Sequence, residues 1–325
     1  MAPQPSRPTI ALCSVDESIE ELRDMLAKHF DVKMKPCKNE DELVEFAADA
    51  DGIFVDLLPV TESAIEKLPK CKAIVLYSDG FDYVDYAAAA KRGISVSHMP
   101  DYCVEEVADH AVIMALALTR KLWQANTDVK NKIWDWPRLR PIKALRDSVM
   151  GIIGLGRLGS VAALRARAFG MRVLEYDPYI PPGREKVFGA EAVDLETLLK
   201  ESDVVTIHVP LTKETHHMVA ERQLRAMKKT AYLINTSRGK VVDTLALYKA
   251  LKDGWIAGAA LDVLEEEPPK ASDPLLALPN LILTPHTAFY SERSIKEKQR
   301  KVVEEFSRIL SGQPGRYRVQ PPTYG

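Results

Sequence analysis

The sequence predicts an α/β protein with two parallel sheets, and three observations support this. Short β-branched apolar runs alternate with longer segments of helical spacing along most of the chain. These runs fall into two series, which begin near residues 9 and 149. The length of 325 residues corresponds to roughly two domains at about 100–200 residues each. Strand–helix alternation of this kind favours parallel strands covered by helices.

The first series contains runs typical of buried parallel strands, at 9–15, 52–58, 73–78 and 94–99. A helix is expected over 18–30, between the first two runs. A longer helix is expected over 105–124. Its residues from Ala108 to Leu118 are apolar almost all round, which predicts burial on more than one face.

The second series contains the runs 149–156, 172–177, 203–209, 231–236, 257–263 and 280–286. A last helix follows, with Ser291 as a good N-cap and Gly312 as its end. If this helix packs back on the first series, the first domain is discontinuous. We therefore expect one domain of residues 1–103 plus 292–325 and a second of residues 104–291.

Composition and charge exclude several classes of function. The net charge is −2, from 44 Lys and Arg against 46 Asp and Glu, so overall charge does not favour nucleic acid. No apolar run approaches the ~20 residues of a membrane helix, and residues 1–15 lack the apolar core of a secretory signal. The cysteines look like reduced thiols of a cytoplasmic protein, because they lie far apart without a CxxC pair: Cys13, Cys37, Cys71 and Cys103.

A glycine-rich motif indicates a dinucleotide site. The GxGxxG pattern follows a predicted strand and opens a predicted helix, as Gly154-Leu155-Gly156-Arg157-Leu158-Gly159. Its glycines allow a tight turn and the close approach of a pyrophosphate to the helix N-terminus. Asp177 follows the next strand, where a carboxylate accepts hydrogen bonds from ribose hydroxyls and repels a 2′-phosphate. The motif therefore predicts NAD as the cofactor, in preference to NADP.

Three polar side chains at the ends of later strands suggest the reaction. Arg238 ends the run 231–236, Glu267 follows the run 257–263, and His286 ends the run 280–286. Ligands of open α/β sheets bind outside the carboxyl ends of the strands, so these groups can converge. Reduction of a 2-oxoacid needs a cation for its oxygens and a proton donor, which Arg238 and His286 supply. Glu267 can bond the second imidazole nitrogen and favour its protonated form.

The chain resembles the D-isomer-specific 2-hydroxyacid dehydrogenase family, and most of all its C-terminal-binding-protein branch. The matching stretches are 80–85, 104–110, 151–159, 176–179, 216–218, 235–239, 258–263, 266–268 and 284–292. The resemblance implies a flavodoxin-like substrate domain, a Rossmann NAD domain, a cleft between them, and homodimers. It also implies Arg238, Glu267 and His286 as the catalytic residues. The residues it places at the cofactor are Val209, Pro210, Thr212, Thr236, Ser237 and, near the nicotinamide amide, Asp262.

The same resemblance places a substrate-binding turn at Ser78, Asp79 and Gly80, and an aromatic wall of the substrate pocket at Phe289. Asp79 departs from the family pattern, because a carboxylate facing a substrate carboxylate costs on the order of 1 kcal/mol or more. We expect either that Asp79 points away from the substrate, or that it pairs with a cationic or hydroxyl group on an unusual one. The pair His216-His217 is not expected to bind metal, because adjacent residues converge poorly and no nearby ligands complete a set.

The leading interpretation is an NAD-dependent D-2-hydroxyacid dehydrogenase that acts as a 2-oxoacid reductase. One alternative is a corepressor-like interaction protein that senses NADH, since the C-terminal-binding-protein branch includes such proteins. Another is a phosphite-type dehydrogenase, since these enzymes keep the Arg, Glu and His. Formate is disfavoured, because formate dehydrogenases of this superfamily pair the His with Gln where Glu267 stands.

Overall fold

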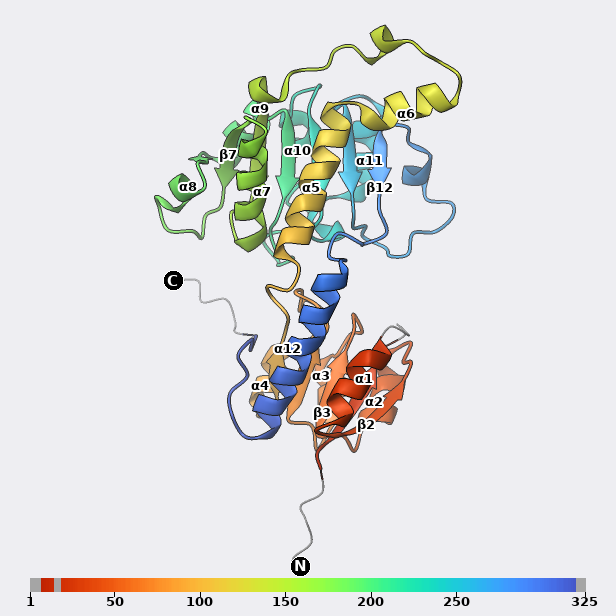
Figure 1. Ribbon diagram of the computed structural model, residues 1–325, viewed down its shortest axis with the longest axis vertical. Helices are drawn as coiled ribbons and strands as arrows, with labels where there is room; N and C mark the ends of the chain where they lie inside the picture. Colours follow the sequence, from red (N-terminus) through yellow and green to blue (C-terminus); the bar gives the residue numbers. More distant parts are fainter. Residues whose placement is uncertain (1–6, 15–18, 320–325) are drawn as a thin grey trace, which may run out of the picture. The chain divides into compact units, whose positions relative to one another are not determined.

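The computed structural model describes residues 7–14 and 19–319, and the chain divides into two compact units. One unit contains residues 1–102 and 291–325, and the other contains residues 103–290. Each is built on one parallel sheet with helices on both faces (Figure 1). Three sequence-based expectations fall partly outside the described residues: the N-terminal segment 1–6, Val15 at the end of the first run, and Ser18 at the start of the first helix.

The first unit has a five-stranded sheet in the order β2-β1-β3-β4-β5, the flavodoxin-like order. Its strands are β1 (Thr9–Cys13), β2 (Asp31–Lys35), β3 (Gly52–Val55), β4 (Ala73–Leu76) and β5 (Ser95–Ser97). The four predicted runs are confirmed. The sequence analysis missed β2, because this edge strand pairs only with β1 and none of its side chains is fully buried.

Two layers of helices cover this sheet. The helices on one face are α2 (Glu40–Ala47), α3 (Glu62–Glu66) and α4 (Tyr86–Lys91), and those on the other are α1 (Glu20–Ala27) and α12 (Glu292–Leu310). α12 lies directly against β3, because a Cβ on Gly52 would come within 2.7 Å of the Phe306 ring. Ser291 caps α12 as predicted, since its hydroxyl accepts the N–H of Ser294 at 2.9 Å. The helix expected over 18–30 is shorter, at 20–27.

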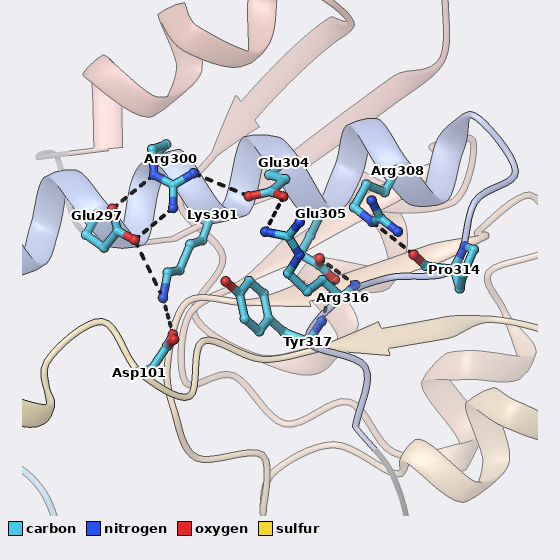
Figure 2. Close-up of polar contacts among 10 residues, drawn as sticks. All are labelled: Asp101, Glu297, Arg300, Lys301, Glu304, Glu305, Arg308, Pro314, Arg316 and Tyr317. Carbon is cyan, nitrogen blue, oxygen red and sulfur yellow. Dashed lines mark hydrogen bonds and ion pairs between the residues drawn. The ribbon is translucent and has the colours of Figure 1, made fainter. Parts of the chain in front are cut away.

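A polar network holds α12 to the rest of this unit (Figure 2). Lys301 is buried and pairs with Asp101, from the segment after β5, and with Glu297 on its own helix. Glu305 is also buried, and it accepts the backbone N–H of Arg316 at 2.8 Å. Each buried charge therefore has a partner, which a stable core requires. The network explains why the C-terminal helix packs on the first sheet.

The second unit has a seven-stranded sheet in the order β12-β11-β10-β9-β6-β7-β8. Its strands are β6 (Val149–Ile153), β7 (Arg172–Tyr176), β8 (Glu191–Ala192), β9 (Val204–Ile207), β10 (Tyr232–Asn235), β11 (Gly258–Leu261) and β12 (Leu281–Leu283). All six predicted runs are confirmed. The two-residue edge strand β8 was missed, because it has no apolar run. Strand order reverses between β6 and β9, which is the switch point where ligands of such sheets bind.

Helices cover both faces of this sheet as well. One face carries α5 (Val104–Thr119) and α7 (Arg157–Ala168), which lie side by side in Figure 1. The other carries α9 (Leu195–Glu201), α10 (Glu221–Ala226) and α11 (Thr244–Lys252). The remaining helices are α6 (Leu122–Lys130), α8 (Arg184–Val187) and the 3-10 turns η2 (Trp136–Leu139), η3 (Leu145–Asp147), η4 (Gly239–Val241) and η5 (Pro274–Ala277).

The single helix expected over 105–124 is wrong. α5 ends at Thr119, Lys121 adopts a left-handed conformation with φ 50°, and a separate α6 begins at Leu122. Burial is also less complete than predicted, because the Ile113 side chain is 62% exposed. Among the helices described, none is both long and apolar enough to cross a membrane. Within residues 7–14 and 19–319, no group of three or more His, Cys, Asp or Glu side chains is arranged to hold a metal ion.

Candidate active site

The glycine-rich loop lies in the second unit, at the switch point between β6 and β9. Gly154 has φ 92°, and a Cβ there would lie 2.8 Å from Val209 and 3.0 Å from the backbone of His208. A Cβ on Gly159 would lie 2.0 Å from the carbonyl oxygen of Gly154. Both positions therefore require glycine, the first for its φ and the second for close contact between helix and loop.

The start of α7 fits a dinucleotide phosphate. Gly156 is its N-cap, and no described side chain caps the helix there. A Cβ on Gly156 would meet nothing within 4 Å, so the space beside the N-cap residue is open. Those N–H groups, from Arg157, Leu158 and Gly159, have no intrahelical partners and carry the positive end of the helix dipole. An anion such as a pyrophosphate matches this arrangement.

Asp177 lies beside the same loop, one residue beyond β7. Its Oδ2 accepts the N–H of Leu155 at 2.9 Å, and its Oδ1 accepts the N–H of Tyr179 at 3.0 Å. Two residues earlier on β7, the Glu175 carboxyl is almost fully buried. Burial, and then the charges of Asp177 and Glu185, raise the pKa of Glu175 to about 7. The sequence analysis did not single out Glu175, although a glutamate inside a strand of buried residues is itself an unusual signal.

The other predicted cofactor residues lie on loops that follow β9 and β10. The loop at Val209, Pro210 and Thr212 closes in a turn, where the Thr215 hydroxyl donates to Pro210 O at 2.6 Å and accepts the Thr212 N–H at 2.8 Å. The Thr236 hydroxyl is buried and has no hydrogen-bond partner among the described residues.

Asn235 shapes the turn that carries Ser237 and Arg238. Its Oδ1 accepts the Ser237 hydroxyl at 2.8 Å, and its Nδ2 donates to the Arg238 carbonyl at 2.9 Å. The sequence analysis missed this residue. The signal was an Asn at the end of a strand, directly before a turn, which is typical of a turn built on the side chain.

Glu267 and His286 form a hydrogen-bonded pair. Glu267 Oε2 lies 2.7 Å from His286 Nδ1, and Glu267 Oε1 accepts the Leu264 N–H at 2.7 Å. Burial acts to raise the pKa of Glu267. This effect is outweighed by the hydrogen bond and charge of His286, by the Leu264 N–H and by the charge of Arg238. The pKa of Glu267 therefore lies below its usual range. Glu267 is therefore ionised and accepts a hydrogen bond from the Nδ1–H of His286, which leaves Nε2 of the ring to exchange a proton with a ligand.

Arg238 belongs to the same cluster. Its Nη1 donates to the Ser237 carbonyl at 2.9 Å. The turn behind it packs against the loop that carries Glu267, because a Cβ on Gly239 would lie 2.0 Å from the carbonyl of Leu264. The second unit thus combines a cation, a carboxylate and an imidazole at the ends of three neighbouring strands.

Asp262 anchors the loop that carries His286. Its buried carboxylate accepts the Thr284 hydroxyl at 2.5 Å, the Thr287 N–H at 2.9 Å and the Ala288 N–H at 2.9 Å. The His286 N–H donates to the Asp262 carbonyl at 2.8 Å. These bonds hold His286 in a left-handed conformation with φ 50°. The predicted contact of Asp262 with the cofactor stays a prediction.

The predicted substrate turn lies in the first unit. The Ser78 hydroxyl donates to the Gly80 carbonyl at 2.7 Å, and His98 Nδ1 lies 2.6 Å from the Asp79 carbonyl oxygen. The same Nδ1 is 3.6 Å from Asp79 Oδ1, so a protonated His98 would offset the charge of that carboxylate. In the second unit, the ring of Phe289 meets His286 edge-on, with 6.4 Å between centroids.

Comparison with known proteins identifies the family. Residues 112–288 match the sequence model described as D-isomer specific 2-hydroxyacid dehydrogenase, NAD binding domain, and the chain belongs to this family. It is an NAD(P)-dependent oxidoreductase that interconverts 2-oxoacids and D-2-hydroxyacids. Similar curated proteins include the glyoxylate reductases of Korarchaeum cryptofilum, 42% identical over 89% of both chains, and of Thermococcus litoralis, 43% identical over 82% of this chain and 80% of that protein.

Solved structures with the same fold include two with bound ligands. D-lactate dehydrogenase from Aquifex aeolicus, complexed with NAD and lactic acid, is 36% identical over 93% of this chain and 96% of that chain, with a TM-score of 0.85. An acyclic imino acid reductase in complex with NADPH and D-Arg is 27% identical over 96% of this chain and 100% of that chain, with a TM-score of 0.87.

The expected closeness to the C-terminal-binding-protein branch is wrong, since the similar curated proteins are glyoxylate reductases. Four of the stretches behind that expectation, 151–159, 235–239, 266–268 and 284–292, form the cofactor loop and the Arg, Glu and His cluster. Any enzyme that reduces 2-oxoacids in this fold needs those features, so they identify the family and do not distinguish its branches.

Proposed function

We propose that this protein is a glyoxylate reductase that uses NADH. The observation that carries the proposal is the cluster of Arg238, Glu267 and His286, with 2.7 Å between Glu267 Oε2 and His286 Nδ1. Glyoxylate reductases that match four-fifths or more of the chain at 42–43% identity support the choice of substrate.

Each residue of the cluster has a role that follows from its chemistry. The nicotinamide, when bound, supplies the hydride for reduction. The planar guanidinium of Arg238 orients the carboxylate of the 2-oxoacid and polarises its carbonyl. His286 donates the proton from Nε2 to the carbonyl oxygen as negative charge develops there. Glu267 keeps Nδ1 protonated, fixes the plane of the ring and stabilises the imidazolium.

A panel of 2-oxoacids tests the substrate. We expect NADH oxidation with glyoxylate at a kcat/KM at least about tenfold above pyruvate and phenylpyruvate, since a difference of one methylene or more can change kcat/KM by that much. A higher value for a larger 2-oxoacid would overturn the choice of glyoxylate but keep the reaction class. Turnover of phosphite alone, or no turnover with NADH still bound, would overturn the proposed function.

The preference for NADH over NADPH rests on Asp177. A carboxylate at the end of this strand bonds ribose hydroxyls and repels a 2′-phosphate, and the buried Glu175 adds a second acidic group behind it. We expect Asp177→Ser to reduce the ratio of kcat/KM for NADH to that for NADPH by about tenfold or more. This is the effect of losing one modest charge interaction. An unchanged ratio would refute this role.

Asp79 is expected to pair with His98 and not with a cationic substrate, which the 3.6 Å between Asp79 Oδ1 and His98 Nδ1 supports. The imino acid reductase that holds D-Arg makes the alternative worth testing. We expect Asp79→Ser to change kcat/KM for neutral and cationic 2-oxoacids by the same factor. A selective loss with the cationic substrates would favour the alternative.

The predicted homodimer would use the outer surface of α5, α6 and the segment from α6 to the start of η2. Large apolar side chains are exposed there: Ile113, Leu122, Trp123, Trp134 and Trp136, of which Trp134 is 89% exposed. An exposed apolar surface of this kind usually contacts a partner, and we assign it to a second copy of the chain. Sedimentation should give a dimer for the wild type and a monomer for Trp123→Glu. A monomeric wild type would refute the assignment.

A cytoplasmic location also remains part of the proposal. The four cysteines are free and buried, which suits a reducing compartment.

A further inference from the structure

Glu265 lies two residues before Glu267 on the same loop, and the mechanism above leaves it without a role. Its carboxylate joins this loop to two other segments of the second unit. Oε1 accepts the N–H of Thr244, the first residue of α11, at 2.8 Å. Oε2 lies 3.3 Å from Nε2 of His217, at ion-pair distance but without the geometry of a hydrogen bond. The loop that presents Glu267 is therefore held by a hydrogen bond at one oxygen of a neighbouring side chain and by a close contact at the other.

The charge state of Glu265 makes these ties effective. Burial acts to raise the pKa of Glu265, but the hydroxyl and N–H of Thr244 and the contact with His217 outweigh it, so this pKa lies below its usual range. The N–H of Thr244 also belongs to the positive end of α11. An ionised Glu265 therefore has a favourable electrostatic environment at both oxygens.

His217 is held in an uncommon backbone conformation. It has φ 51°, which non-glycine residues seldom adopt and which costs of order 1 kcal/mol or more. Its N–H donates to the carbonyl of Lys240 at 2.8 Å, and its ring stacks on His216 with 4.1 Å between centroids. These contacts hold its imidazole against Glu265.

The same residues connect the segments that carry Arg238 and Glu267. The turn η4 begins immediately after Arg238. It contains Lys240, whose carbonyl accepts the His217 N–H. Gly239 of η4 packs on the backbone of Leu264, at the start of the loop that carries Glu267. A shift of the 264–267 loop would therefore have to break the contacts of Glu265 with both His217 and Thr244.

We infer that His217 and Glu265 are positioning residues, which clamp the 264–267 loop so that the Glu267 carboxylate meets His286 Nδ1. The inference rests on the proposed function, in that Glu267 and His286 form its acid–base pair. The clamp acts only through Glu267. Loosening it should lower kcat, while the distant cofactor loop at Gly154–Gly159 keeps its affinity for NADH.

Substitution of the clamp tests the inference. We expect Glu265→Gln and His217→Gln each to lower kcat with glyoxylate by about tenfold, and to leave the Kd for NADH within about twofold. The matched control is Glu266→Gln. Its carboxylate is exposed and pairs with Lys270 at 3.1 Å, so kcat should stay within about twofold of the wild type.

A double-mutant cycle separates positioning from a general loss of structure. In a Glu267→Gln background, Glu265→Gln should lower kcat by less than about threefold, because the clamp has no carboxylate left to aim. A full tenfold loss in that background, or wild-type kcat in the single variants, would overturn the inference.

A readout without turnover keeps the inference separate from the proposed function. The NMR resonance of the His286 Nδ1–H, which reports its hydrogen bond to Glu267, should shift in Glu265→Gln, as in Glu267→Gln and unlike Glu266→Gln. This shift would support the clamp even if glyoxylate were not the substrate. An unchanged resonance in a variant that retains the wild-type Tm would refute it.

Discussion

The buried carboxyl of Glu175 predicts that folding stability falls as pH rises through neutrality. Its side chain is 2% exposed, and its Oε2 has no hydrogen-bond partner among the described residues. Burial, with the charges of Asp177 and Glu185, raises its pKa from 4.5 to about 7. Because the folded pKa lies above the unfolded one, the folded state binds more protons between these values. Stability is therefore full below pH 4.5 and is lost as pH rises to about 7.

The size of the effect follows from the two pKa values. Their separation of about 2.5 corresponds to roughly 3.4 kcal/mol once Glu175 is ionised, at 1.36 kcal/mol for each tenfold change. Most of this falls between pH 5 and pH 8, where linkage gives a difference of about 2.5 kcal/mol. Glu175→Gln removes the ionisation and keeps the shape of the side chain.

Urea unfolding at the two pH values measures the effect. The free energy of unfolding of Glu175→Gln minus that of the wild type should be about 2.5 kcal/mol more positive at pH 8 than at pH 5. A constant packing cost of the amide cancels in this comparison. Glu66→Gln, at an exposed position, serves as the control and should show no such difference. An equal effect of Glu175→Gln at both pH values would refute the reasoning.

Three further substitutions test the site and the fold. Arg238→Ala should lower kcat/KM for glyoxylate by about 100-fold with NADH affinity retained, and survival within about threefold would contradict its role. Gly159→Ala should weaken NADH binding and lower Tm, because its Cβ would lie 2.0 Å from the Gly154 carbonyl oxygen; wild-type values would contradict the close packing. Burial lowers the pKa of His208 to about 4, so stability is present above pH 6.5 and lost as pH falls from there. In His208→Gln the loss of stability below pH 6.5, measured by urea unfolding, should be smaller than in the wild type. An unchanged pH dependence would refute this role of His208.

Sequence patterns predict those parts of the fold that depend on residues close together in the sequence. The buried central strands read as apolar runs, and Ser291 caps its helix through a contact three residues away. The edge strands β2 and β8 lack an apolar run, because only one neighbouring strand and few side chains cover them. The break after α5 was missed for a related reason. It depends on the backbone of Lys121, and the apolar pattern continues past it.

The features of the site also divide into those that the sequence predicts and those that depend on distant contacts. The convergence of Arg238, Glu267 and His286 could be predicted because each follows a strand, and parallel strands bring their carboxyl ends together. The contacts of Glu265 could not be predicted, since its partners His217 and Thr244 lie far from it in the sequence. In the run of three glutamates at 265–267, each carboxylate has a different partner.

The most direct test of the account is glyoxylate-dependent oxidation of NADH by the wild type and by His286→Gln. The account predicts steady turnover by the wild type, and a fall in kcat of about 100-fold or more in the variant, the usual contribution of a general acid. NADH affinity should be the same in both. Wild-type protein that binds NADH without reducing glyoxylate, or a variant that keeps the wild-type kcat, would contradict it.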